Sequence, residues 1–350
     1  MLKEEIKKLL FEGTVIPAHP LALDENRKLD EDAQRRLTNY YMEAGAGGIA
    51  VGVHTTQFEI RDSEFGLYEK VLALATEEIN KKKLARPFIK IAGICGPVEQ
   101  ALKEAQTAKD LGYDLGLLSN GGLTELTEVE LLERTKKVAE IIPVFGFYLQ
   151  PSVGGRPFSY SFWKQFAEIP NVYAIKMAPF NRYQTLDVVR AVCHSTRCDE
   201  IALYTGNDDN IVNDLLTTFE VNVNGHLVRK NIIGGLLGHW AVWTNKAVEL
   251  FEEIKSVRDS NQVPASLLTL GQQVTDANAA FFDSANQFQG CIAGINEVLA
   301  RQGLLKGNWC LLKKEKLSPG QSDEIDRVYQ DYPHLHDNQF VKQFLLIPNK

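Results

Sequence analysis

Eight short apolar runs, each followed by a stretch with helical periodicity, constrain the fold of this 350-residue chain more than any other feature. The runs are rich in β-branched and aromatic residues and recur about every 25 to 35 residues, which is typical of buried parallel strands that alternate with helices. Eight such units predict an α/β fold that closes into a (β/α)8 TIM barrel. The predicted strands are residues 13–18, 49–53, 87–94, 113–119, 144–151, 171–177, 200–205 and 231–238.

An open doubly wound sheet is the alternative architecture for such a pattern. It would carry a Gly-x-Gly-x-x-Gly turn after the first strand, and the sequence has no such turn there. Residues 220–230 interrupt the last unit and predict a hairpin that turns at Asn224-Gly225. Beyond residue 262 the pattern is helical only. We therefore predict two parts, a barrel over residues 1–262 and a C-terminal helical extension over residues 263–350 that packs on it.

Two neighbouring predicted strands end in reactive side chains, the fifth at Tyr148 and the sixth at Lys176. Partial burial at the end of an apolar strand lowers the pKa of an ammonium group, so that more of it is the neutral amine that attacks a carbonyl carbon. A phenol nearby can pass protons to and from the adduct. The pattern predicts a Schiff-base site with Lys176 as nucleophile and Tyr148 as acid/base. It leaves open a plainer interpretation, a lysine that extends to solvent and a tyrosine in the core.

Further polar residues follow other predicted strands. In barrels of this kind the catalytic groups come from the C-terminal ends of the strands, where Thr55 and Thr56 follow the second strand and the Gly206-Asn207-Asp208 turn follows the seventh. We predict that His54, beside the threonines, binds substrate, and the alternative is a hydrogen-bonded structural histidine. Asn207 and Asp208 either contact substrate hydroxyls or form an Asx turn.

At these positions the sequence resembles the dihydrodipicolinate synthase / N-acetylneuraminate lyase family of Schiff-base aldolases. The similarity extends over about residues 10–330, and the order and spacing of its motifs make it specific. The motifs that carry it are Thr55-Thr56, Tyr148-Leu149-Gln150-Pro151, Ala174-Ile175-Lys176, Thr205-Gly206-Asn207-Asp208, and two segments at 293–296 and 303–307.

The resemblance implies a site and a reaction. Lys176 would form a Schiff base with a 2-keto acid such as pyruvate, Tyr148 and Thr56 would move protons, and Thr55 would bind the keto-acid carboxylate. The family also implies a homo-oligomer, a dimer or a tetramer. The residues that we assign to substrate binding are Thr55, His54, Gly206, Asn207 and Leu236.

Departures from the family pattern refine the expected activity. The synthase branch has an arginine five residues after the catalytic tyrosine, where this chain has Val153, and the segment between Gly52 and the threonines is longer. We therefore expect aldol cleavage or condensation of a pyruvate-type 2-keto acid rather than dihydrodipicolinate synthesis. The alternatives are a dehydratase of a deoxy-keto sugar acid and a catalytically silent barrel that binds a metabolite.

Composition limits partners and cofactors. The net charge of −7 argues against nucleic acid or an anionic membrane as partner. Residues 1–10 lack an apolar signal core and no apolar stretch is long enough to span a bilayer, so we expect a cytoplasmic protein. The five cysteines are scattered without a Cys-x-x-Cys pair and no His-Glu-x-x-His motif occurs. We therefore expect reduced thiols, no metal and no other cofactor.

Overall fold

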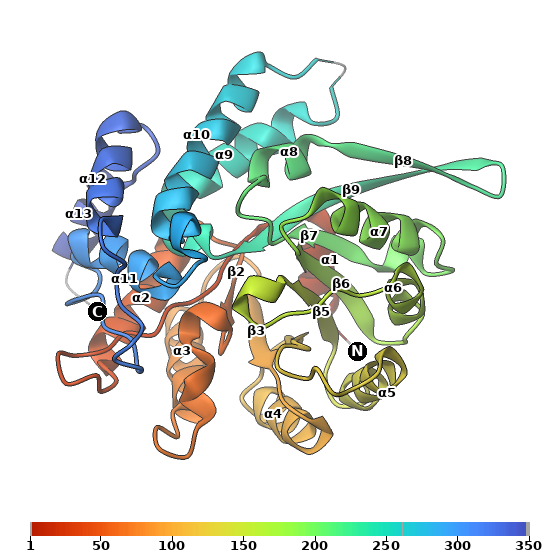
Figure 1. The fold of residues 1–350 in the computed structure, drawn as a ribbon, viewed down its shortest axis with the longest axis horizontal. Coiled ribbons are helices and arrows are strands. Elements are labelled where there is room, and N and C mark those ends of the chain that lie inside the picture. The colour runs from red at the N-terminus through yellow and green to blue at the C-terminus, as the bar shows by residue number, and fades with distance from the viewer. Residues whose placement is uncertain (1, 261, 348–350) are drawn as a thin grey trace.

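The computed structural model describes residues 2–260 and 262–347, in which eight parallel strands form one nearly closed barrel (Figure 1). A parallel bridge between Ala18 and Ala50, and a 2.8 Å hydrogen bond from the His19 amide to the Ala50 carbonyl, join the two ends of the strand order. The predicted (β/α)8 fold is confirmed. The strands follow the order β1 (Val15–Pro17), β9 (His226–Leu237), β7 (Ala202–Thr205), β6 (Val172–Ala178), β5 (Val144–Leu149), β4 (Leu115–Leu118), β3 (Ile89–Ile94) and β2 (Gly48–Val51).

Amphipathic helices alternate with these strands and cover the outside of the barrel (Figure 1). Local signals in the sequence set where several of them begin. Asp30 caps one helix by accepting a hydrogen bond from the Ala33 amide, and Thr127 and Glu130 form a capping box at another. The covering helices are α2 (Glu31–Glu43), α3 (Tyr68–Lys82), α4 (Val98–Asp110), α5 (Glu128–Ala139), α6 (Tyr160–Ala167), α7 (Arg182–Cys193), α8 (Ile211–Leu216) and α9 (Thr244–Val257).

A helix that we did not predict, α1 (Glu4–Glu12), closes the N-terminal end of the barrel. Its apolar residues Ile6 and Leu10 share one cluster with the side chains that fill the barrel interior. The Tyr204 hydroxyl donates a 2.8 Å hydrogen bond to the Leu10 carbonyl and fixes the helix there. Because this end is filled, a ligand site in the barrel must lie at the C-terminal ends of the strands.

The predicted hairpin is confirmed and projects from the barrel (Figure 1). Strand β8 (Thr218–Val223) pairs antiparallel with the first half of β9, and the turn falls at Asn224-Gly225. Both turn residues have positive φ, 52° and 87°, which the type I′ turn of a two-residue hairpin requires. The second half of β9 is the predicted eighth barrel strand. One long strand therefore serves both the hairpin and the barrel.

The C-terminal extension is helical, as expected, and packs against one side of the barrel (Figure 1). The Tyr40 hydroxyl in α2 donates a 2.6 Å hydrogen bond to Asp337 and accepts one of 2.9 Å from the Thr244 amide. The division at residues 262 and 263 stays a prediction, and its outer ends, residues 1 and 348–350, lie outside the described residues. The helices are α10 (Ala265–Phe281), α11 (Cys291–Arg301), α12 (Gln321–Asp331) and α13 (Asn338–Leu346).

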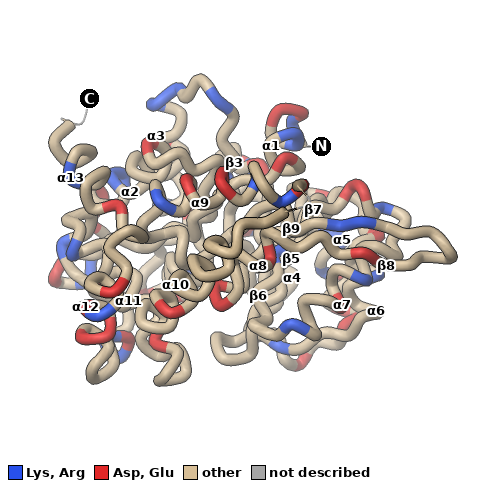
Figure 2. The backbone as a smooth tube through the Cα atoms, turned by 90° about the horizontal axis from the view of Figure 1, so that it is seen from above, with Lys and Arg blue, Asp and Glu red and all other residues tan. Residues whose placement is uncertain are grey.

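The surface carries both signs of charge. Figure 2 shows acidic and basic residues interspersed over the outer helices, whereas the tip of the β8–β9 hairpin carries neither. Within residues 2–260 and 262–347, no helix combines the length and the apolar character needed to cross a membrane.

Candidate active site

A cavity of about 60 Å³ lies at the C-terminal ends of the barrel strands. The cavity is lined by residues of several strands and by residues of the C-terminal extension. Those with chemical or steric significance are His54, Thr55, Phe147, Gln150, Lys176, Gly206, Asp208, Phe282, Phe288 and Cys291.

Lys176 enters this cavity from the inner face of β6 and is 8% exposed. Its Nζ lies 4.4 Å from the centroid of the Phe147 ring. The side chain passes directly over Gly206, where a Cβ atom would lie only 2.5 Å from Lys176 Cε. Glycine at this turn therefore makes the room that the lysine side chain needs. Both predicted residues line the cavity.

Burial and mutual attraction set the protonation of Lys176 and Asp208. Burial lowers the pKa of the Lys176 ammonium, and the Asp208 carboxylate partly offsets this by raising it. Burial likewise raises the pKa of the Asp208 carboxyl, against a hydrogen bond from the His239 amide and the charge of Lys176, which lower it. The two pKa values thus move toward each other. The interaction between Lys176 and Asp208 is purely electrostatic, because no hydrogen bond or ion pair joins these two residues, both of which the structure describes.

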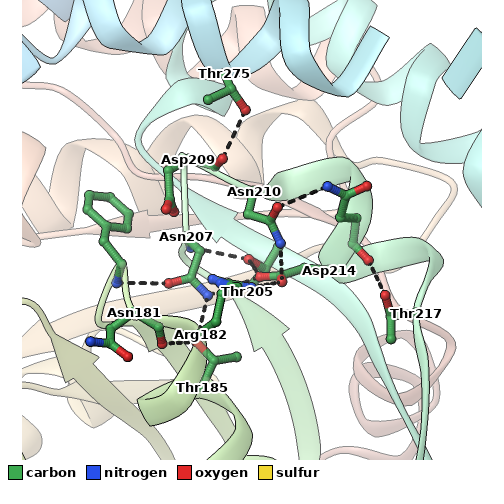
Figure 3. A network of polar contacts seen from close by, with 12 residues as sticks. Asn181, Arg182, Thr185, Thr205, Asn207, Asp209, Asn210, Asp214, Thr217 and Thr275 are labelled. Atoms are coloured by element: carbon green, nitrogen blue, oxygen red, sulfur yellow. Dashed lines mark hydrogen bonds and ion pairs between the residues drawn. The ribbon is translucent and has the colours of Figure 1, made fainter. Parts of the chain in front are cut away.

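A polar network around Asp214 holds the turn of residues 205–210, which includes Asp208 (Figure 3). At its centre the buried Asp214 carboxylate accepts hydrogen bonds from the Thr205 hydroxyl at 2.7 Å and from the Asn207 and Asn210 amides at 3.0 Å each. It also pairs with Arg182. Asn207 is fully engaged, because its carbonyl oxygen accepts from the Phe180 amide. Asn207 therefore supports the turn and does not line the cavity, so its predicted contact with substrate is wrong in this structure.

The placement of Tyr148 beside Lys176 is also wrong. Successive side chains of a strand point to opposite faces, and in β5 it is Phe147 that faces the barrel interior while Tyr148 faces the helices. The Tyr148 ring packs 5.1 Å from the Trp163 ring, and its hydroxyl accepts a 3.2 Å hydrogen bond from the Phe158 amide. Tyr148 does not line the cavity that holds the lysine.

The 3-10 turn His54–Thr56 contributes two of its three residues to the cavity. Thr55 lines it, and its hydroxyl donates to the Ala18 carbonyl at 2.8 Å. His54 also lines it, and burial, assisted by the charge of Lys176, lowers its pKa to about 4. His54 is therefore neutral at physiological pH.

Thr56 and Leu236 do not reach the cavity, contrary to prediction. The Thr56 hydroxyl accepts hydrogen bonds from the Gly52 and Val53 amides and donates a 2.6 Å bond to the His19 carbonyl. One donor and two acceptor positions are all that a hydroxyl has, so none remains to relay protons. The Leu236 side chain is buried in the apolar interior of the barrel.

Sequence reasoning undervalued or missed several cavity residues. Asp208 stood in a turn that we had located, and its acidic side chain after a barrel strand was a usable signal. Phe282, Phe288 and Cys291 come from the C-terminal extension, and nothing in the sequence connects them to the barrel mouth. Within the described part of the chain, no three His, Cys, Asp or Glu side chains group in a way that could hold a metal ion.

Comparisons with known proteins agree with this architecture. The model of the dihydrodipicolinate synthetase family matches residues 12–239. A 4-hydroxy-tetrahydrodipicolinate synthase of Caldicellulosiruptor bescii is 28% identical over 207 residues, which is 58% of this chain and 65% of that protein. A second such synthase, of Clostridium novyi, is 27% identical over 187 residues, 53% of this chain and 58% of that protein. The chain thus spans less than two thirds of the length of these curated relatives.

Solved structures show the same fold. A prophage protein of the dihydrodipicolinic acid synthase family from E. coli K12, in complex with pyruvate, has a TM-score of 0.75 at 16% identity, with 93% of this chain and 99% of that chain covered. The protein CdNal from Clostridium difficile, in complex with mannosamine, has a TM-score of 0.72 at 14% identity, with 91% and 99% covered.

Proposed function

Because the chain belongs to the dihydrodipicolinate synthetase family, we propose that it is a Schiff-base-forming lyase or synthase that acts on a 2-keto acid of the pyruvate type. The observation that carries this proposal is the burial of the Lys176 amine in a cavity at the C-terminal ends of the barrel strands. Catalytic groups of such barrels lie at this face. A lysine with a lowered pKa is the nucleophile that imine formation needs.

Asp208 takes the role of acid/base that the sequence suggested for Tyr148. In the first step the Lys176 ammonium gives a proton to the Asp208 carboxylate through a water molecule between them, and the neutral amine attacks the keto carbon of the substrate. The proton that the attacking nitrogen then loses moves to the keto oxygen, which gives the carbinolamine. The carbinolamine hydroxyl then takes the proton from Asp208 and leaves as water, which forms the imine. The raised pKa of Asp208, caused mainly by burial, suits a group that must both accept and donate this proton.

The protonated imine then draws electrons from the neighbouring carbon. A carbon–carbon bond at that position breaks or forms as the electron pair moves into, or out of, the imine. We assign the keto-acid carboxylate to the turn at Thr55, whose hydroxyl can rotate away from the Ala18 carbonyl to donate to the substrate. Neutral His54 beside it can hydrogen-bond a substrate oxygen without adding charge. The small cavity suits the three-carbon end of a 2-keto acid.

Trapping the imine tests the proposal. The protein is incubated with pyruvate, reduced with borohydride and digested, and the modified peptide is located by mass spectrometry. We expect one adduct, on Lys176, and none in the Lys176→Ala variant. Lys90 is the matched control, because it also stands in a barrel strand with a pKa lowered by burial but does not line the cavity. Lys90→Ala should label as the wild type does.

Two results would contradict the proposal. An adduct on a different lysine would refute the site. No adduct with pyruvate or with other small 2-keto acids, from folded protein, would favour the silent metabolite-binding barrel instead. Water loss from a deoxy-keto sugar acid, without a cleaved fragment, would identify the dehydratase alternative. The homo-oligomer stays a prediction.

A further inference from the structure

A second cavity, of about 420 Å³, lies beside the one that holds Lys176. Leu149 and Val153 line both cavities, so the two cavities are neighbours. The loops that follow β2, β3, β4 and β5 line the second cavity, with Arg61, Cys95, Ser119 and the glycines 121 and 122 among its residues. A group held in this cavity would be close to the reacting lysine but would not itself contact it, because Lys176 does not line this cavity.

Arg61 lines the second cavity, and Arg134 lies directly behind its wall, where it donates to the carbonyls of the lining residues Gly96 and Ser119. Arg61 and Arg134 are both buried, and only one buried carboxylate, Glu104, pairs with them, at 3.0 Å from Arg61 Nε. Arg134 donates its hydrogen bonds to neutral oxygens, those of Gly96, Asn120 and Ser119. Asp62 also lines the cavity, but its side chain is exposed to solvent. In the described part of the chain, one buried guanidinium charge thus has no carboxylate.

The other guanidinium group, that of Arg61, has its carboxylate partner but lacks an acceptor among the described residues for one of its nitrogens. Arg61 Nε pairs with Glu104, and Nη2 donates to the Gly52 and Gly93 carbonyls at 2.9 Å each. Arg61 Nη1 is buried, and no described residue accepts its hydrogen bonds. Buried charged donors are normally satisfied. An anion in the cavity would offset the charge of Arg134, which has no described carboxylate partner, and would supply an acceptor for Arg61 Nη1.

We propose that the second cavity binds an anionic group, a carboxylate or a phosphate, of a small molecule. Arg61 is the anchor that pairs with the anion, and Arg134 adds positive potential. The anion has two chemical sources. It is either the distal end of the molecule that reacts at Lys176, in which case the inference rests on the proposed function, or a separate anionic effector, in which case it does not.

Titration of the full chain with inorganic phosphate and with succinate, followed by calorimetry, tests the site. We expect saturable binding that weakens at least 10-fold in Arg61→Gln. Because Arg61 also supports two loops, Gly122 supplies an independent test. It has a φ of 73°, and a Cβ atom added there meets no atom within 4 Å. Gly122→Asp should weaken anion binding at least 10-fold by repulsion, whereas Gly122→Asn, with equal size and equal backbone strain, should bind as the wild type does.

Two arms distinguish the sources of the anion. If it is the distal end of the substrate, the 2-oxoglutarate concentration that half-saturates the borohydride-trapped adduct rises at least 10-fold in Gly122→Asp relative to Gly122→Asn. If it is an effector, phosphate still binds in the presence of saturating 2-oxoglutarate. Absence of saturable binding, or equal binding by both Gly122 variants, would overturn the proposal. The direct titration does not depend on Schiff-base chemistry, so failure of the Lys176 labelling would leave its result intact.

Discussion

Lys176 and Asp208 share one small cavity, and this determines which proton transfers are available there. Each group, isolated in an apolar cavity, would favour its neutral form, and each attracts the charged form of the other. The charged and the neutral pair are consequently close in free energy. A pair of this kind can release the amine for attack and still hold the proton for the water that leaves.

Asp208→Asn should slow formation of the trapped pyruvate adduct at least about 100-fold, the contribution typical of a general acid/base. The fold should survive, because the asparagine carbonyl can still accept the hydrogen bond from the His239 amide. Loss of the carboxylate also lowers the pKa of Lys176 further. In a plot of the residual rate against pH, the rise on the acidic side should therefore move to lower pH. The exposed neighbour Asp209 supplies the control, Asp209→Asn. Equal rates in the two variants would exclude Asp208 as the acid/base.

Tyr148→Phe should change the rate of adduct formation less than about 3-fold, because the phenol faces the helices and not the cavity. It should lower the free energy of unfolding by about 1 kcal/mol, the typical contribution of one hydrogen bond, here with the Phe158 amide. Urea denaturation measures the second effect. If the variant unfolded like the wild type but formed no adduct, the phenol would be catalytic after all.

The strand register explains why Lys176 lines the cavity as predicted whereas Tyr148 does not. A lysine at the end of an apolar strand is unusual enough to stand out alone. Whether a phenol from the next strand joins it depends on which residues are level across β5 and β6, and here Lys176 pairs with Phe147 while Tyr148 pairs with Met177. A difference of one residue moves a side chain to the other face of the sheet. Local sequence does not encode that register.

The turn after β7 depends on one carboxylate, and Asp214→Ala should destabilise the protein by about 3 kcal/mol. The substitution leaves Arg182 without its buried partner and removes the acceptor for the Thr205, Asn207 and Asn210 side chains. Asp187→Ala is the matched control, since Asp187 pairs with Arg190 on the exposed face of α7. Its cost should stay below about 0.5 kcal/mol. Urea unfolding that gave equal losses would refute the role of the network.

At the scale of elements, local sequence signals predicted individual helices and turns. They did not predict which distant residues those elements pack against. The hairpin could be predicted because its turn needs two successive residues with positive φ. Few residue pairs other than Asn-Gly, here Asn224-Gly225, adopt that conformation readily. The residues Leu2, Ile6 and Leu10 recur every four positions, a helical stripe, so α1 itself was predictable. Its docking into the end of the barrel was not, since that depends on Tyr204 and on strand residues far along the chain.

At the scale of the whole molecule, the eightfold alternation of strand and helix predicted the barrel. Each strand–helix unit has apolar strand and helix faces that are buried when eight units close into a ring. The extension was predicted as helices that pack on the barrel, but its share in the cavity was not. Phe282, Phe288 and Cys291 complete the wall around Lys176 and Asp208. The extension is therefore part of the site, a consequence of tertiary packing that no repeat or motif marks.

Buried neutral histidines should make the stability of the whole molecule depend on pH. Burial lowers the pKa of His19 and of His239 to about 4 each. An unfolded histidine titrates near 6.5, so between pH 6.5 and 4 the unfolded chain binds more protons than the folded chain. Stability should fall in that window by about 1.4 kcal/mol for each histidine and each pH unit.

The carboxyl of Asp208 acts in the opposite direction, because its raised pKa stabilises the folded state as pH falls. The decisive measurement is therefore a difference, the urea-derived free energy of unfolding of the wild type minus that of His239→Gln, at several pH values. This difference should shrink by about 1.4 kcal/mol per pH unit below pH 6.5 and be constant above it. His226→Gln, at an exposed hairpin position, should follow the wild type throughout. A difference that did not vary with pH would mean that His239 is protonated in the folded protein.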